Sequence, residues 1–169
     1  MQRDADADAF AATEVQVVVR RALEGDHAGI VALVRSEPLN PNGLHWHRFV
    51  VASDAQGLVG AAQLRRNSDG SHELASLVVR PQARGRGIAA QMIDRLVDGR
   101  RGRVFAVTRR ANLARFARWG FVEIDARDAA RDVRTRRMIG QLASVVSLLR
   151  GRRPSALVVL ERVPPTQPA

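Results

Sequence analysis

The sequence predicts a single α+β domain whose centre is a mixed, mostly antiparallel sheet with helices on its faces. Two apolar runs, 49–51 and 58–64, flank the polar turn 54–57, and a second turn at 67–70 leads into the apolar run 74–79. This pattern is typical of a three-stranded meander. At 169 residues without cysteine, the chain is long enough to build one core without disulfides.

The first third of the chain predicts one strand, one helix and a loop. The β-branched run 15–20 is typical of a strand, and Ile30, Leu33 and Val34 recur on one face of a helix. Prolines, asparagines and a glycine fill 36–46, which indicates a loop rather than a second long helix.

The second half of the chain predicts further helices and strands. We expect a helix through Met92, a strand at 103–107, a helix at 112–119, a strand at 121–125, a long helix at 129–150 and a last strand at 156–160. The long helix carries an apolar stripe at Met138, Leu142, Val145 and Leu149. This order differs from the regular alternation of a doubly wound fold. We expect the domain to span 14–163, between disordered tails at 1–13 and 164–169.

A loop rich in arginine and glycine joins the strand 74–79 to the helix that follows it, and it contains Gly85 and Gly87. The first amides of a helix have no partner within the helix, and the helix dipole favours negative charge there. Glycine also lets an anion approach the main chain closely. The loop therefore predicts a site for a pyrophosphate.

Two common phosphate motifs fit this loop poorly. A P-loop requires lysine, and the chain has none. The dinucleotide fingerprint matches Gly85, Gly87 and Ala90, but five residues separate the strand from Gly85 and no acid follows the next strand. An arginine after that strand would suit the 2′-phosphate of a dinucleotide, so the motif alone does not exclude dinucleotide binding. The order of helices and strands argues against a dinucleotide-binding fold.

A third motif fits better and occurs together with a second one downstream. Leu77-x-Val79-x-Pro81-x-x-Arg84-Gly85-x-Gly87-Ile88-Ala89 resembles motif A of the GNAT superfamily of acyl-CoA-dependent N-acetyltransferases. The segment from Asn112 to Gly120-Phe121 resembles the family's N-x-x-A-x-x-[FY]-Y-x-x-x-G-F segment, with a small shift in spacing. The resemblance covers about 14–163 and implies the GNAT fold, in which two parallel strands splay apart.

The resemblance implies acetyl-CoA as the cosubstrate and no metal. The pantetheine arm would pair with main-chain groups around Leu77 and Val79, and amides from Arg84 to Ala89 would hold the pyrophosphate. The Val79 N–H would polarise the thioester carbonyl. The implied cofactor contacts are Leu77, Val78, Val79, Arg84, Gly85, Arg86, Gly87, Ile88, Ala89, Asn112 and Phe116.

Acyl transfer to an amine requires a base, because an ammonium group has no lone pair. Glu73 lies six residues before Val79 and aligns with the glutamate used as base in the histone-acetylating branch of the family. Alternation places Glu73, Ala75, Leu77 and Val79 on one face, where burial would raise the carboxyl pKa. A solvated carboxylate at the strand end is an equal alternative, and His72, on the other face, is a weaker candidate base.

The tyrosine with which many family members protonate the departing CoA thiolate is missing. Phe116 occupies its position, and the chain contains no tyrosine. A thiol with a pKa of about 8.5 is a tolerable leaving group, so we predict activity without a tyrosine acid. A non-catalytic acyl-CoA-binding regulatory module is the first alternative, and a basic nucleic-acid-binding protein is the less favoured second one.

Composition bounds the partners and the compartment. The formal net charge of +10 comes from arginines spread along the chain, and aromatic residues make up only 4%, so nucleic acid is not an expected partner. No apolar run approaches the ~20 residues of a membrane span. We expect a cytoplasmic protein without membrane contact, and a homodimer stays open.

The acceptor is expected to be a primary amine, on a small molecule rather than on a protein. Residues 38–47 occupy the place where family members build the acceptor wall, and Trp46 and Trp119 are candidates for wall or core positions. The arginines of the long helix predict either a solvated face or the attraction of an acidic acceptor. If the second interpretation holds, replacing Arg134 and Arg137 with glutamine should raise the KM for acidic acceptors only.

Overall fold

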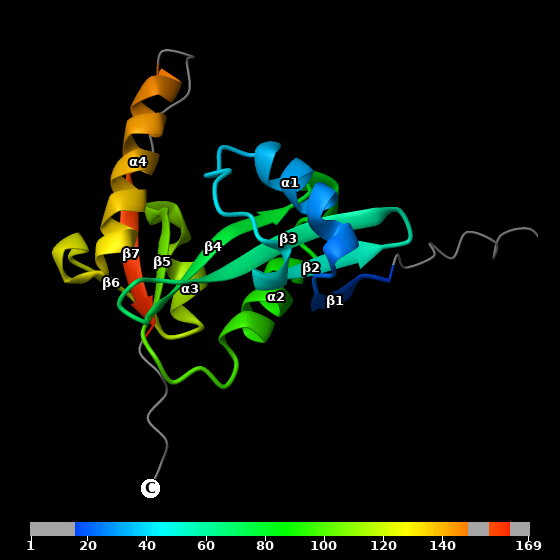
Figure 1. The fold of residues 1–169 in the computed structure, drawn as a ribbon, viewed down its shortest axis with the longest axis horizontal. Helices are drawn as coiled ribbons and strands as arrows, with labels where there is room; N and C mark the ends of the chain where they lie inside the picture. Colours follow the sequence, from blue (N-terminus) through cyan, green and yellow to red (C-terminus); the bar gives the residue numbers. More distant parts are fainter. Residues whose placement is uncertain (1–15, 149–155, 163–169) are drawn as a thin grey trace, which may run out of the picture.

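The computed structural model describes residues 16–148 and 156–162, which build one seven-stranded sheet of order β1-β2-β3-β4-β5-β7-β6 (Figure 1). The strands are β1 Val18–Arg21, β2 Phe49–Asp54, β3 Gly57–Arg66, β4 His72–Val79, β5 Val104–Arg109, β6 Phe121–Ile124 and β7 Leu157–Arg162. Only β4 and β5 are parallel neighbours, and the other pairs are antiparallel. The predicted α+β fold is confirmed, while the predicted tails lie outside the described residues.

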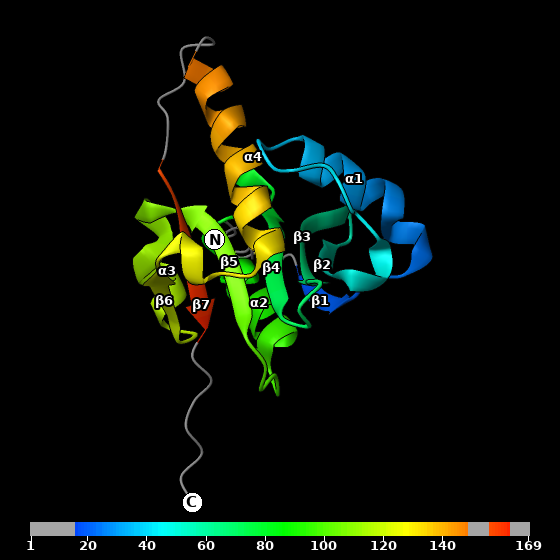
Figure 2. The same cartoon turned by 60° about the vertical axis from the view of Figure 1, so that its left-hand side comes forward.

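Helices cover both faces of the sheet (Figures 1 and 2). Helix α1, His27–Arg35, packs on one face of β2 and β3, and α4, Arg131–Leu148, covers β5 and β7 on that same face. Helix α2, Ile88–Val97, and the short α3, Leu113–Ala117, pack on the opposite face. A ligand at the centre of the sheet would therefore meet different helices on the α1/α4 face and on the α2 face.

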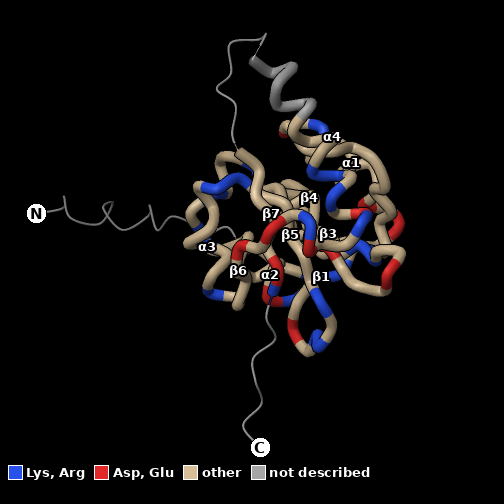
Figure 3. The backbone as a smooth tube through the Cα atoms, turned by 90° about the vertical axis from the view of Figure 1, so that its left-hand side faces the viewer, with Lys and Arg blue, Asp and Glu red and all other residues tan. Residues whose placement is uncertain are grey.

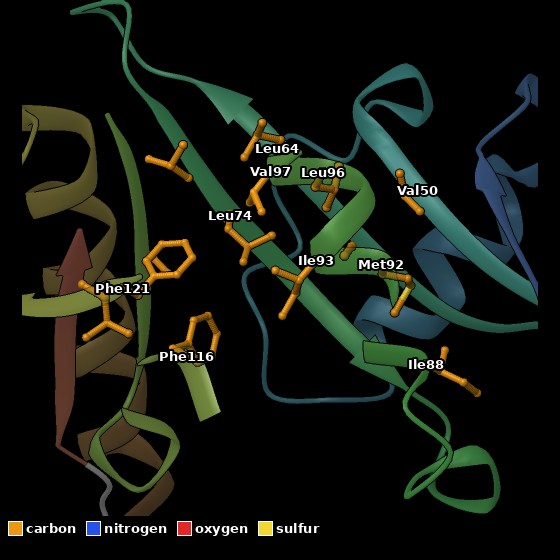
Figure 4. Close-up of a cluster of buried hydrophobic side chains, with 14 of the residues drawn as sticks. Val50, Leu64, Leu74, Ile88, Met92, Ile93, Leu96, Val97, Phe116 and Phe121 are labelled. Atoms are coloured by element: carbon orange, nitrogen blue, oxygen red, sulfur yellow. The ribbon is translucent and has the colours of Figure 1, made fainter. Parts of the chain in front are cut away.

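The α2 face holds the larger apolar core (Figure 4). Met92 and Ile93 are buried against Val50 and Leu74 of the sheet. A Cβ added at Gly60 would lie 3.1 Å from the Met92 terminal methyl group, so helix and strand approach closely there. This packing fixes the start of α2 at the carboxyl end of β4.

A β-bulge at Ser76 changes the direction of the side chains of β4. Ser76 has a φ of 53°, and the register with β3 shifts between Ala61 and Gln63. Before the bulge, Glu73 lies on the α1/α4 face; after it, Leu77 and Val79 pack with the α2 core. The prediction that Glu73 and Val79 share a face is therefore wrong, because the bulge adds one residue to the alternation.

Two predictions about helices also need correction. The helix expected at 112–119 is shorter, since Asn112 ends a 3₁₀ turn, Arg110–Asn112, before α3 begins. Met138 does not belong to a buried stripe and is 58% exposed. A Cβ at Gly140 would lie 3.1 Å from Leu157 of β7, so the face containing Val133 and Gly140 meets the sheet and turns Met138 outward.

Candidate active site

The centre of the sheet opens between β4 and β5. Their pairing covers His72, Glu73 and Leu74 and ends opposite Ala106, although both strands continue. Beyond this point the facing main-chain groups of the two strands are not bonded to each other. An extended ligand can therefore pair with the β4 edge as a substitute strand.

The direction of the backbone at the end of β4 favours such a ligand. The Arg80 amide donates to the Val59 carbonyl of β3 at 2.8 Å. Because consecutive N–H groups of a strand point to opposite sides, the Val79 N–H points away from β3, toward the opening. The sequence prediction that the Val79 N–H is available to a ligand is consistent with this geometry.

The glycine loop leads from this edge into α2. Gly85 and Gly87 have φ values of 81° and 73°, a region that favours glycine. The bond from the Gln91 amide to the Gly87 carbonyl, at 3.1 Å, belongs to the first turn of α2. The amides of Ile88 and Ala89 precede it and have no partner within the helix, so the loop end presents donors to an anion.

Arg84 contributes to the shape of this loop. Its Nε donates to the Val79 carbonyl at 2.9 Å, its guanidinium pairs with Glu37, and its amide donates to Pro81 at 3.2 Å. The Arg84 side chain therefore ties the strand end to the segment after α1. Its predicted contact with a cofactor stays a prediction, as does that of the exposed Arg86.

The downstream motif residues lie beside β5. Asn112 donates to the Thr108 hydroxyl at 3.0 Å and holds the turn that follows the strand. Phe116 is 8% exposed, and its ring meets Phe121 edge-on at 5.5 Å (Figure 4). Trp119 donates to Asp94 on the α2 face and borders an open hollow of about 750 Å³. Phe116 and Trp119 thus contribute to packing whatever else they contact.

The α1/α4 face of β4 carries a buried polar cluster. Glu73 is 4% exposed and forms an ion pair with Arg136 of α4, whose Nη2 donates to the Asn67 amide oxygen at 2.9 Å. Burial raises the pKa of Glu73, and Arg136 and Arg65 lower it by less. A buried carboxyl with a raised pKa is a candidate proton acceptor, although its position between two arginines also suits a structural role.

Two further residues of β3 complete this cluster. Arg65 is 7% exposed and Gln63 is fully buried. The Gln63 amide oxygen can accept from Arg65 Nε at 3.1 Å and from the Ser76 hydroxyl at 2.9 Å, while its nitrogen donates to the Gly43 carbonyl at 3.3 Å. The cluster therefore reaches the bulge that borders the opening and the loop after α1.

Sequence reasoning missed Arg65, Gln63, Ser76 and Arg136. Gln63 and Arg65 alternate with the apolar Ala62 and Leu64, which would suit a solvent-facing side of the strand. Both are buried because the segment after α1 and helix α4 cover that side. The arginines that the sequence singled out, Arg134 and Arg137, instead donate to the carbonyls of Arg127 and Leu157.

The described residues were searched for metal-binding groups and for helices that could span a membrane. The residues that the structure describes contain no group of three or more His, Asp or Glu side chains placed to hold a metal ion. Within the same ranges, no helix combines the length and apolarity required to cross a bilayer. Arginine positions are distributed over the described fold and alternate with acidic ones (Figure 3).

Comparison with known proteins bears on the family. The sequence profile described as acetyltransferase (GNAT) domain matches residues 45–123, which include β4, the glycine loop and the downstream motif. Residues 45–123 are thus similar to a GNAT acetyltransferase domain. The resemblance seen in the sequence is thereby confirmed over these residues. A search of curated proteins found no match in sequence.

Solved structures agree with the GNAT fold. N-acetylglutamate synthase from Neisseria gonorrhoeae, complexed with coenzyme A and N-acetyl-glutamate, is 24% identical with a TM-score of 0.63 over 88% of this chain and 35% of that one. The chain thus spans about a third of that protein. Rv2747 from Mycobacterium tuberculosis, in complex with CoA and NLQ, is 25% identical with a TM-score of 0.63 over 86% and 98% of the two chains. Diaminobutyrate acetyltransferase EctA from Paenibacillus lautus, at 14% identity and a TM-score of 0.60 over 92% and 99%, shares the fold.

Proposed function

We propose that this GNAT domain transfers the acetyl group of acetyl-CoA to a primary amine of a small molecule, by direct attack in a ternary complex. The observation that carries the proposal is the divergence of β4 and β5 beside a glycine loop with free helix-start amides. That combination suits a thioester arm next to a diphosphate. Structural relatives crystallised with coenzyme A support the choice of cosubstrate.

The cosubstrate would lie along the carboxyl half of β4. The amides from Gly85 to Ala89 would hold the diphosphate at the positive end of α2. The pantetheine arm would pair with the main chain of Leu77 and Val79. The Val79 N–H would then donate to the thioester oxygen as negative charge develops on it during attack.

Glu73 is the proposed base. An attacking amine has to lose a proton, and a raised carboxyl pKa brings the base closer to the pKa of the proton donor. The bulge turns Glu73 away from the face of Val79, so we expect the proton to reach Glu73 through water. The departing thiolate requires no tyrosine, because a thiol of pKa about 8.5 is an adequate leaving group.

The acceptor is proposed to be a free amine on a small molecule. N-acetyl-glutamate in one relative and L-2,4-diaminobutyric acid in another indicate that this fold accepts small amines. The walls next to the opening come from the segment after α1 and from α4 (Figures 1 and 2). Specificity is commonly set by the segments at the rim of a site, so we expect these walls to set acceptor choice.

A thiol-release assay tests the proposal. Acetyl-CoA is incubated with the protein and a panel of primary amines that includes amino acids, diamines and a lysine peptide, and free CoA is measured. We expect release with at least one small amine and none without an amine. Tight binding of acetyl-CoA by calorimetry with no release on any amine would favour a regulatory acyl-CoA-binding module instead.

A further inference from the structure

The buried cluster on the α1/α4 face contains more positive than negative charge. Arg65, Arg136 and the half-buried Arg48 lie on this side, and Glu73 and Asp132 are the carboxylates that face them. Glu73 pairs with Arg136, and Asp132 lies 3.8 Å from Arg136 while accepting from the Ser68 amide at 2.8 Å. Both carboxylates are therefore committed to partners other than Arg65.

Among the described residues, Arg65 hydrogen-bonds directly to neutral groups alone, while Glu73 acts on it through its charge. It stands directly opposite Glu73 in the β3–β4 register, yet no ion pair among the described residues includes it. Its guanidinium bonds to the neutral oxygens of Ser76 and Gln63. Burial lowers the pKa of Arg65, the charge of Glu73 raises it by less, and Arg136 and Arg48 lower it. A buried guanidinium in this state gains free energy when a carboxylate pairs with it.

The position of Arg65 connects this charge to the reaction. Ser76, which accepts from Arg65 Nη2 at 3.3 Å, belongs to the bulge where β4 leaves β5. Arg65 is thus one hydrogen bond from the strand that borders the opening. A ligand whose amine reaches the thioester from the α1/α4 face would have its other end among these arginines.

We propose that the acceptor carries a carboxylate and that Arg65, supported by the charge of Arg48, binds this carboxylate. The site rests on the proposed function for its substrate class, that of small amino acids or related amino carboxylates. Arg65 is a specificity-determining residue in this account. Arg136 serves instead as the partner of Glu73.

Matched acceptors test the proposal. The kcat/KM of a series of L-amino acids is compared with that of the corresponding amino-acid amides, for the unmodified chain, Arg65→Gln and the control Arg134→Gln. Arg134 is exposed on α4 and donates only to a carbonyl at 3.4 Å. We expect Arg65→Gln to reduce the preference for acid over amide by about tenfold or more, with the affinity for CoA unchanged. Arg134→Gln should behave as the unmodified chain.

An unchanged acid-to-amide ratio in a folded Arg65→Gln protein that binds CoA would overturn the proposal. If Arg65→Gln fails to fold, Arg48→Gln replaces it, because Arg48 is only partly buried. A drop of about threefold in the same ratio is expected there, and no drop would overturn the site.

A binding experiment separates this site from the proposed function. The CoA-loaded protein is titrated with N-acetyl-L-alanine and with N-acetyl-L-alaninamide by calorimetry. Tighter binding of the acid that disappears in Arg65→Gln supports the carboxylate site even if no amine is acetylated. Equal binding of acid and amide overturns the site even if acetylation occurs.

Discussion

The two faces of β4 are built in different ways. On the α2 face, one continuous stretch from Leu77 to Ala90 provides the strand edge, the glycine loop and the helix start. On the α1/α4 face, the buried polar groups come from β3, β4 and α4, which are far apart in the sequence. The cofactor side thus depends on local backbone geometry, whereas the acceptor side depends on tertiary contacts of side chains.

The bulge at Ser76 joins these two faces. It rotates the side chains so that Glu73 faces the arginines while Leu77 and Val79 join the α2 core. The hydroxyl of the same residue donates to the Gln63 amide oxygen and accepts from Arg65. A single backbone irregularity would therefore let one strand serve the proposed cosubstrate on one side and the proposed acceptor on the other.

The largest effect is expected from Glu73→Gln on the acceptor side. Removing the base should lower kcat by about 100- to 10,000-fold, while the affinity for acetyl-CoA, which depends on the other face, stays the same. Single-turnover kinetics and calorimetry measure the two quantities. If kcat falls by less than about threefold, Glu73 serves only as the partner of Arg136.

A smaller effect is expected from Gly87→Val on the cofactor side. A β-branched residue at a φ of 73° costs about 1–3 kcal/mol, which corresponds to about 5- to 150-fold in the Kd for acetyl-CoA if the loop distorts. The control is Gly102→Ala, where an added Cβ meets nothing within 4 Å and φ is not positive. Equal affinity in both variants would separate the loop from cofactor binding.

The smallest shift is expected from Arg136→Gln, and it appears in the pH dependence. Arg136 lowers the pKa of Glu73 against the larger effect of burial, so removing Arg136 raises that pKa further. A base acts when deprotonated, so the acidic limb of the kcat profile should move to higher pH. A limb that stays in place would exclude Glu73 as the titrating base.

The contribution of Glu73 to the stability of the folded protein decreases as the pH rises. Burial raises the pKa of Glu73 in the folded protein above its ordinary value. Glu73 therefore contributes a stabilisation that is complete below that value and is lost as the pH rises through the folded-state pKa. Denaturant unfolding at pH 4 and pH 7, compared with Glu73→Gln, measures this difference.

The parts of the site that depend on neighbouring residues in the sequence could be predicted. Gly85, Gly87 and the helix start at Ile88 are recognisable because left-handed glycines and unpaired amides have a fixed spacing. The face of Glu73 was mispredicted because Ser76 is a non-glycine residue in a left-handed conformation, which no residue preference signals. The pairing of Glu73 with Arg136 joins residues 63 positions apart, and only the packing of α4 brings them together.

A crystal structure with acetyl-CoA tests the central claim most directly. We expect the diphosphate within hydrogen-bond distance of the amides of Gly87, Ile88 and Ala89, with the thioester oxygen facing the Val79 N–H between β4 and β5. A cosubstrate bound elsewhere, with these amides turned to solvent, would contradict it.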